Sequence, residues 1–181
     1  MKRIIVLFLI LFNILIIYSI PRPKKNKDVG AFVGRISLNS IDTWQITLYI
    51  KNNNTGKDIV IRPMIIKSRC YHLVNLNPGT YSLYKFSISR TSGNYRYWAK
   101  DLELKDNIID IIVQPNKITP VSFLEIFIGY GGINRIQYGF RIDNIDNNKY
   151  LNELKLYFEE LDKRGLWKDF EWDELKYNRN I

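Results

Sequence analysis

Residues 72–86 read HLVNLNPGTYSLYKF, in which a Pro-Gly pair separates two strand-like runs. Pro78 restricts φ at the first central position of a turn, and Gly79 accepts the positive φ that a type II turn requires at the second. Leu76 precedes the turn and Tyr81 follows it, so we expect both side chains to pack beneath it. The stretch predicts a corner of a β fold rather than a reactive site.

Short strands continue on both sides of this corner. In residues 44–51, WQITLYIK, apolar and polar side chains alternate with the period of a half-buried strand, and the NNNTGKD of residues 52–58 predicts a hairpin loop. Together these runs predict an antiparallel β-sandwich of eight or nine strands. The further expected strands are residues 58–66, 69–76, 81–89, 94–104, 108–115, 118–129 and 133–143.

Several strands carry more specific expectations. Pro63 indicates an edge strand or a bulge, and the change of phase near Leu83 indicates a second bulge. Residues 118–129 are apolar on nearly both faces and are expected at the centre of a sheet. In the strand before the corner, alternation places these residues on one face, with the cysteine as a small core residue: Cys70, His72, Val74 and Leu76.

The period of the hydrophobic pattern changes after residue 146. Asn147 or Asn148 is a candidate N-cap for an amphipathic helix, and Gly165 is a candidate stop. The expected buried positions of this helix are Leu151, Leu154, Phe158 and Leu161. In residues 166–175, Trp167, Phe170 and Trp172 predict a second short helix. We expect it to cover one end of the sandwich, with docking of a partner or membrane as the alternative.

Composition describes one globular domain with a basic leader. The chain has 181 residues, of which 46% are hydrophobic, and a net charge of +9. Six of its 27 basic residues and none of its 18 acidic residues lie in residues 1–27. The rest of the chain therefore has 21 basic and 18 acidic residues, a net charge of +3. Because so small an excess is a weak signal for phosphate binding, no nucleic-acid partner is expected.

The leader has the layout of a bacterial signal peptide or an uncleaved membrane anchor. Two basic residues precede an apolar run at residues 4–20, and RPKKNK follows it. No A-x-A cleavage site is visible, so a retained anchor is favoured. The charges flanking the run leave its orientation open, and we expect a domain exported to the cell envelope, at the periplasm or the cell surface.

The sequence therefore divides into four parts: a signal peptide or anchor at residues 1–20, a basic linker at 21–28, a β-sandwich domain at 29–145 and a C-terminal helical extension at 146–181.

The pattern L-x-P-G-x-Y-x-L, from Leu76 to Leu83, resembles the corresponding hairpin of prealbumin-like, carboxypeptidase regulatory-like sandwich modules of bacterial envelope proteins. The resemblance covers about residues 29–129, where GRISL, ITLYI and NTGK match the first strands and loop of such modules. It implies a non-catalytic accessory, adhesive or carbohydrate-associated module. The D-x-D-G-type stretch of the family is absent and the helical tail is additional, so no binding residues carry over.

Few patterns suggest catalysis, a cofactor or a metal site, and we expect none of these. His72 is the single histidine, and no G-x-S-x-G elbow occurs. The GYGG of residues 129–132 and the TGK of residues 55–57 are interpreted as turns rather than phosphate loops, and the DNIDNN of residues 143–148 as helix capping rather than a calcium loop. Among the carboxylates at Asp101, Glu103, Asp106 and Asp110, the first two share a face that we interpret as solvated.

The most suggestive binding stretch is NYRYWAK, which begins at residue 94. An exposed tryptophan flanked by cations stacks well on a base or a sugar ring. The candidate ligand-binding residues are Tyr95 and Tyr97 on one face, and Arg96, Trp98 and Lys100 on the other.

Three functional hypotheses follow. The first is a membrane-anchored or exported envelope protein that acts as a non-catalytic interaction or structural module, with a protein or glycan partner. The second is a carbohydrate-binding or glycan-hydrolysing envelope domain that uses the Trp98 strand with Asp101 and Glu103. The third, a cytoplasm-facing module that binds nucleic acid, requires a basic patch that the sequence does not indicate.

Overall fold

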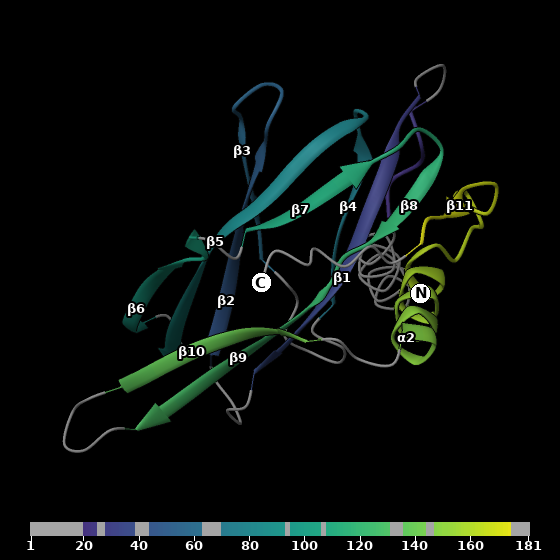
Figure 1. Cartoon of the computed structure of the whole chain (residues 1–181). Helices are drawn as coiled ribbons and strands as arrows, with labels where there is room; N and C mark the ends of the chain where they lie inside the picture. The colour runs from purple at the N-terminus through teal and green to yellow at the C-terminus, as the bar shows by residue number, and fades with distance from the viewer. Residues whose placement is uncertain are drawn as a thin grey trace, which may run out of the picture.

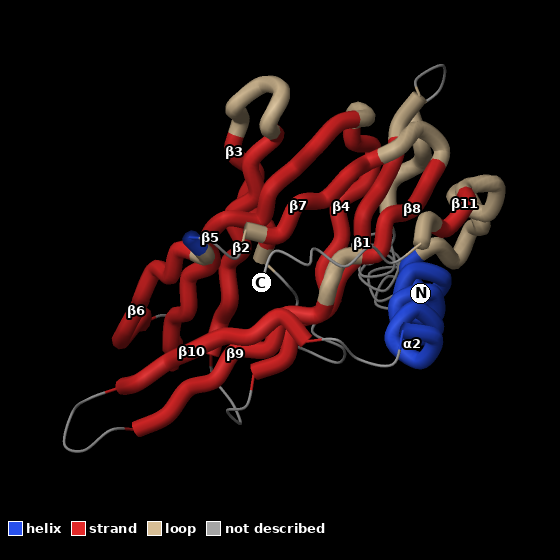
Figure 2. Tube along the Cα trace, viewed as in Figure 1, coloured by secondary structure: helices blue, strands red, loops and turns tan. Residues whose placement is uncertain are grey.

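The structure, a computed structural model, describes residues 20–24, 28–38, 44–62, 70–92, 95–105, 108–130, 136–143 and 147–174. Strands make up most of them, and Figure 2 shows helix α2 (Asn147–Leu161) beside the strands. The strands are β1 (Gly30–Leu38), β2 (Trp44–Asn52), β3 (Asp58–Ile61), β4 (Cys70–Leu76), β5 (Gly79–Ser92), β6 (Tyr95–Glu103), β7 (Ile109–Val113), β8 (Lys117–Pro120), β9 (Phe123–Tyr130), β10 (Ile136–Asp143) and β11 (Glu171–Trp172).

The strands form two sheets, as expected for a mainly β protein of the sandwich type (Figure 1). The first sheet has the order β10-β9-β1-β8-β11, with β4 also paired to β1, and the second has the order β3-β2-β5-β6, with β7 also paired to β5. The second sheet is antiparallel throughout. In the first sheet, however, β1 pairs in parallel with β8 and β9, so the prediction of a fully antiparallel sandwich is wrong there.

The parallel pairing has a topological cause. Strand β7 belongs to the second sheet and β8 to the first. The chain therefore crosses from one sheet to the other before β8 and β9 pair with β1. A crossover can deliver a strand in the same direction as its neighbour, whereas a tight hairpin cannot. The expected central strand at residues 118–129 is confirmed as central but is divided into β8 and β9 at Val121 and Ser122.

The Pro-Gly corner connects the two sheets. Strand β4 before it pairs in the first sheet, and β5 after it pairs in the second. The Tyr81 hydroxyl donates a hydrogen bond of 2.9 Å to the Asn77 carbonyl oxygen, which is the arrangement of a tyrosine corner. Leu76 and Tyr81 are both buried in the core between the sheets, as predicted. Gly79 has φ of 150°, far from the value of about 80° for a type II turn, so that turn type is wrong.

Two backbone irregularities decide which side chains enter this core. The ladder pairs Tyr49 with Lys85 and Ile50 with Leu83, so the predicted bulge near Leu83 is confirmed and lies at Tyr84. In β4, Asn75 has φ of 59°. Because the alternation slips there, Leu76 enters the core between the sheets while Cys70 packs on the opposite face of the first sheet. The prediction that Leu76 shares a face with Cys70 is therefore wrong.

A second core lies between the first sheet and α2. Tyr150, Leu154 and Phe158 of the helix pack on Val33 and Cys70 of the sheet. The predicted helix is confirmed and begins at Asn147, but it ends at Leu161, four residues before the predicted stop at Gly165. Of its expected buried positions, Leu154 and Phe158 are buried and Leu151 and Leu161 are partly buried. Tyr150 is a core residue that the leucine pattern did not indicate.

The segment after α2 differs from its prediction. Instead of a second short helix, residues 163–169 form turns and β11 pairs in parallel with β8. The Asp162 carboxylate accepts hydrogen bonds from the backbone N–H groups of Leu166 and Trp167, at 2.9 and 2.8 Å. These contacts replace helical bonds in the segment. Trp167 is buried in the second core, and Phe170 and Trp172 are partly buried beside it, so the segment packs on the first sheet and α2 as a cover, although not at one end of the sandwich.

The predicted signal peptide or anchor lies almost wholly outside the described residues, of which only Ile20 belongs to it. Within the part of the chain that the structure describes, no helix is both long and apolar enough to cross a membrane.

Candidate functional surface

The outer face of the second sheet combines tyrosine rings with lysine ammonium groups. Since Leu83 and Phe86 are both buried, the bulge places the two residues between them, Tyr84 and Lys85, away from the core. Lys85 Nζ lies 4.0 Å from the centroid of the Tyr49 ring, and Lys51 Nζ lies 5.1 Å from that of Tyr84. Each ring thus carries a cation of the protein itself on one face.

Carboxylates complete this surface. Lys85 Nζ lies 3.3 Å from Asp101 Oδ2, on the neighbouring strand β6. Although burial lowers the pKa of Lys85, the hydrogen bond and charge of Asp101 outweigh it and raise that pKa above its ordinary value. For Tyr84, burial and the charge of Asp58 raise the pKa. The face therefore offers rings, ammonium groups and carboxylates to a polar partner.

The expected solvated role of the β6 carboxylates agrees with their positions. Asp101 and Glu103 are exposed, and Asp101 is engaged by Lys85. Asp110 accepts a hydrogen bond of 2.6 Å from the Ser82 hydroxyl, while Asp106 lies outside the described residues. None of these contacts holds two carboxylates facing each other across a sugar-sized space, as glycoside hydrolysis requires.

The predicted ligand-binding stretch lies on β6, at an edge of the second sheet. The side chains of Tyr95, Arg96, Tyr97 and Trp98 lie outside the described part of the structure, and Lys100 is exposed. In the backbone ladder, Trp98 pairs with Arg90 and Arg96 with Thr91, so the pairing skips Tyr97. The simple alternation predicted for this stretch is therefore interrupted by a bulge.

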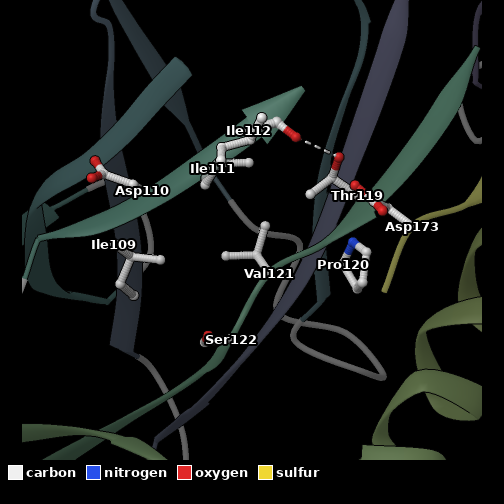
Figure 3. A pocket seen from close by; sticks show the side chains of 9 residues that line it. All are labelled: Ile109, Asp110, Ile111, Ile112, Thr119, Pro120, Val121, Ser122 and Asp173. Carbon is white, nitrogen blue, oxygen red and sulfur yellow. Dashed lines mark hydrogen bonds between the residues drawn. The ribbon is translucent and has the colours of Figure 1, made fainter. Parts of the chain in front are cut away.

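A small pocket opens where β7 and β8 diverge between the sheets (Figure 3). Its volume is about 70 Å³, room for a few water molecules, and the Thr119 hydroxyl at its rim donates a hydrogen bond to the Ile112 carbonyl oxygen. Its nine lining residues are Ile109, Asp110, Ile111, Ile112, Thr119, Pro120, Val121, Ser122 and Asp173. Sequence patterns gave no signal for it, because it arises from the crossover between sheets.

His72 and Cys70 take part in the packing of α2 on the first sheet. His72 Nδ1 lies 3.0 Å from the Tyr157 hydroxyl of α2, and burial lowers the pKa of His72. Cys70 is buried in the second core, which confirms its interpretation as a small core residue. Both residues lie between β4 and α2.

Of the remaining motifs, the structure tests the TGK loop, whose interpretation as a turn agrees with the backbone, while residues 144–146 of the DNIDNN stretch lie outside the described residues. Gly56 has φ of 69° in the loop between β2 and β3, where Asn52 Oδ1 accepts two backbone N–H bonds. Gly129 lies in β9 and pairs with Gln137 of β10, whereas Gly131 and Gly132 lie outside the described residues. Among the described residues, no group of three or more His, Cys, Asp or Glu side chains is arranged to hold a metal ion.

No protein-family model matches the chain, and no curated protein sequence matches it significantly.

Proposed function

We propose that this protein is a non-catalytic, membrane-anchored or exported envelope protein of bacterial type, whose prealbumin-like β-sandwich acts as an interaction or structural module. The observation that carries the proposal is the joint presence of the apolar leader and a two-sheet domain with a tyrosine corner between Tyr81 and Asn77. Such sandwiches present sheet faces and loops to partners.

The non-catalytic part of the proposal rests on how the candidate reactive groups are used. His72 contacts Tyr157, Asp110 accepts a bond from Ser82, and Asp101 pairs with Lys85. Each of these groups supports packing or sheet geometry.

The interaction role is supported by the difference between the two outer faces. Helix α2 and the segment after it cover the first sheet, whereas Val60 on the second sheet is 52% exposed beside Tyr49, its partner in the ladder. A face with exposed aliphatic and charged groups and half-buried aromatic rings suits a protein or glycan surface.

Membrane fractionation of the full chain tests the anchoring. We expect the protein to stay with the membrane after alkaline carbonate extraction, because a 17-residue apolar run is close to the span of a bilayer. A variant with Leu9→Arg and Leu15→Arg should be released, whereas the matched Leu156→Arg, at a surface position of α2, should not. Release of the parent chain by the extraction would contradict a retained anchor.

Export is tested by adding protease to cells whose outer envelope has been opened. Protection of the domain from the protease would contradict export.

The alternative function is binding or hydrolysis of an envelope glycan at the Trp98 strand. Its supporting observation is that β6 lies at a sheet edge with Lys100 exposed. Binding to a glycan array should then be lost in Trp98→Ala and retained in Tyr84→Ala, with circular dichroism as the control for folding. Equal binding by both variants would remove this site.

A further inference from the structure

Residues 20–24, which follow the apolar run, are held against the domain by contacts along their whole length. The Ile20 backbone N–H donates to the Leu161 carbonyl oxygen at 3.4 Å, and the Trp167 indole N–H donates to that of Pro21 at 2.9 Å. The Asn75 side chain bonds both the Arg22 carbonyl oxygen and the Lys24 N–H, at 2.9 and 2.7 Å. We call these five residues the strap.

Ile20 belongs both to the apolar run and to the core of the domain, so no linker residues separate the two. It is the last residue of the apolar run, and its side chain is only 5% exposed, in the second core with Trp167 and Leu154. A helix of 17 residues, the length of this run, spans about 26 Å, against a hydrocarbon thickness of about 30 Å. If the run occupies a bilayer, the membrane surface lies at Ile20 and therefore at the part of the domain that Ile20 contacts.

That part of the domain is the end of α2 and the turn at residues 162–168. Its exposed basic side chains, with those of the strap, are Arg22, Lys24, Lys163, Arg164 and Lys168. The Asp162 carboxylate is bound to the backbone of Leu166 and Trp167. Exposed acidic residues, Glu159, Glu160 and Asp169, also lie here, so attraction to headgroups only adds to the effect of the anchor.

We propose that the strap and the turn at residues 162–168 form the membrane-facing surface of the domain, seated on anionic phospholipid headgroups and held there in one orientation. The proposal rests on the membrane anchoring proposed above. In this arrangement folded contacts, and not a flexible tether, fix the domain to the bilayer. The outer face of the second sheet then points away from the membrane surface that carries the domain.

Energy transfer to the membrane surface tests the orientation. The full chain, with Cys70→Ala to remove the native thiol, is reconstituted into phosphatidylcholine–phosphatidylglycerol vesicles that carry an acceptor dye on the headgroups. A donor dye is attached either at Lys163→Cys, in the turn, or at Thr55→Cys, in the loop between β2 and β3. Figure 1 shows this loop and α2 on opposite sides of the domain.

We expect several-fold stronger transfer from position 163 than from position 55. Equal transfer from the two positions would overturn the proposal, because it indicates a domain that reorients on a loose tether. Failure of the protein to float with the vesicles at all would instead contradict the membrane anchoring of the proposed function, so the two failures are distinguishable.

Two further measurements test separately the short connection at Ile20 and the anionic headgroups. A six-residue Gly-Ser spacer inserted between Ser19 and Ile20 leaves the strap in place and adds slack, so it should abolish the difference between the two positions. A native chain that behaves like the spacer variant would contradict the fixed orientation. In vesicles of phosphatidylcholine alone we expect a smaller difference, and an unchanged one would overturn the role of anionic headgroups.

Discussion

At the scale of single residues, burial determines what the polar side chains do. The Tyr71 hydroxyl is buried and has no hydrogen-bond partner among the described residues, and its ring lies so close to Gly34 that a Cβ there would meet it at 2.5 Å. The Tyr150 hydroxyl, in contrast, donates to the Val121 carbonyl oxygen and accepts from the Arg35 N–H. Burial raises the pKa of both tyrosines, so neither ionises near neutral pH.

This difference predicts opposite effects for the same substitution. Tyr71→Phe removes a buried hydroxyl that forms no bond, and we expect it to leave the free energy of unfolding unchanged or to raise it by about 1 kcal/mol. Tyr150→Phe leaves the Arg35 N–H and the Val121 carbonyl without their partner. It should lower the free energy of unfolding by about 1–3 kcal/mol. Urea denaturation measures both values, and equal effects of the two substitutions would contradict the hydrogen bonding described here.

His72 predicts a dependence of stability on pH. Because burial lowers the pKa of His72 in the folded protein, the folded state binds fewer protons there than the unfolded state, whose histidine has a pKa of about 6.5. Its contribution to stability is therefore complete above that value and is lost as pH falls through the folded pKa. The contact with Tyr157 lies in the interface between β4 and α2, so protonation weakens the packing of this helix.

Since the chain has a single histidine, one variant isolates this effect. Thermal unfolding between pH 8 and pH 5 should show a loss of stability in the parent protein and a smaller loss in His72→Gln. Identical slopes of stability against pH in the two proteins would contradict the assignment to His72.

At the scale of elements, the segment after α2 shows how side-chain contacts redirect a chain. Gly165, with φ of 59°, and the Asp162 carboxylate shape the turn that delivers β11 to the free edge of β8. Asp162→Ala should destabilise the protein by about 1–2 kcal/mol, comparable to the loss of a helix cap. Asp169→Ala, an exposed carboxylate of the same segment, should change little. Calorimetric melting of both variants checks this, and an equal effect would argue against the capping role.

At the scale of the whole molecule, two cores share the first sheet. Trp167 belongs to the second core and contacts Phe158 edge to face, with ring centroids 6.1 Å apart. Trp167→Ala should lower the free energy of unfolding by about 3–5 kcal/mol, as is typical when a buried aromatic side chain is replaced by alanine. Leu156→Ala, at a position of α2 that is 64% exposed, should lower the free energy of unfolding far less.

Guanidinium denaturation followed by fluorescence and by far-ultraviolet circular dichroism measures this loss and shows whether both cores unfold together. A small effect of Trp167→Ala would mean that the C-terminal segment is an appendage to the sandwich, instead of one wall of its second core.

The sequence by itself indicated most of the strands, where α2 begins and where most turns lie, because alternation, helical periodicity and the preferences of Asn, Pro and Gly act locally. It also indicated the corner at Leu76 and Tyr81. It indicated the bulge near Leu83, but not the tyrosine face of the second sheet, because the contact between Lys85 and the Tyr49 ring depends on how β5 pairs with β2.

Only the tertiary structure decided the parallel pairing of β1, the change of face at Asn75, the strand at Glu171–Trp172 and the docking of Ile20. Each of these depends on which sheet edge or apolar surface remains open after distant segments have packed. A local pattern carries no information about such surfaces, because they are created by residues far away along the chain.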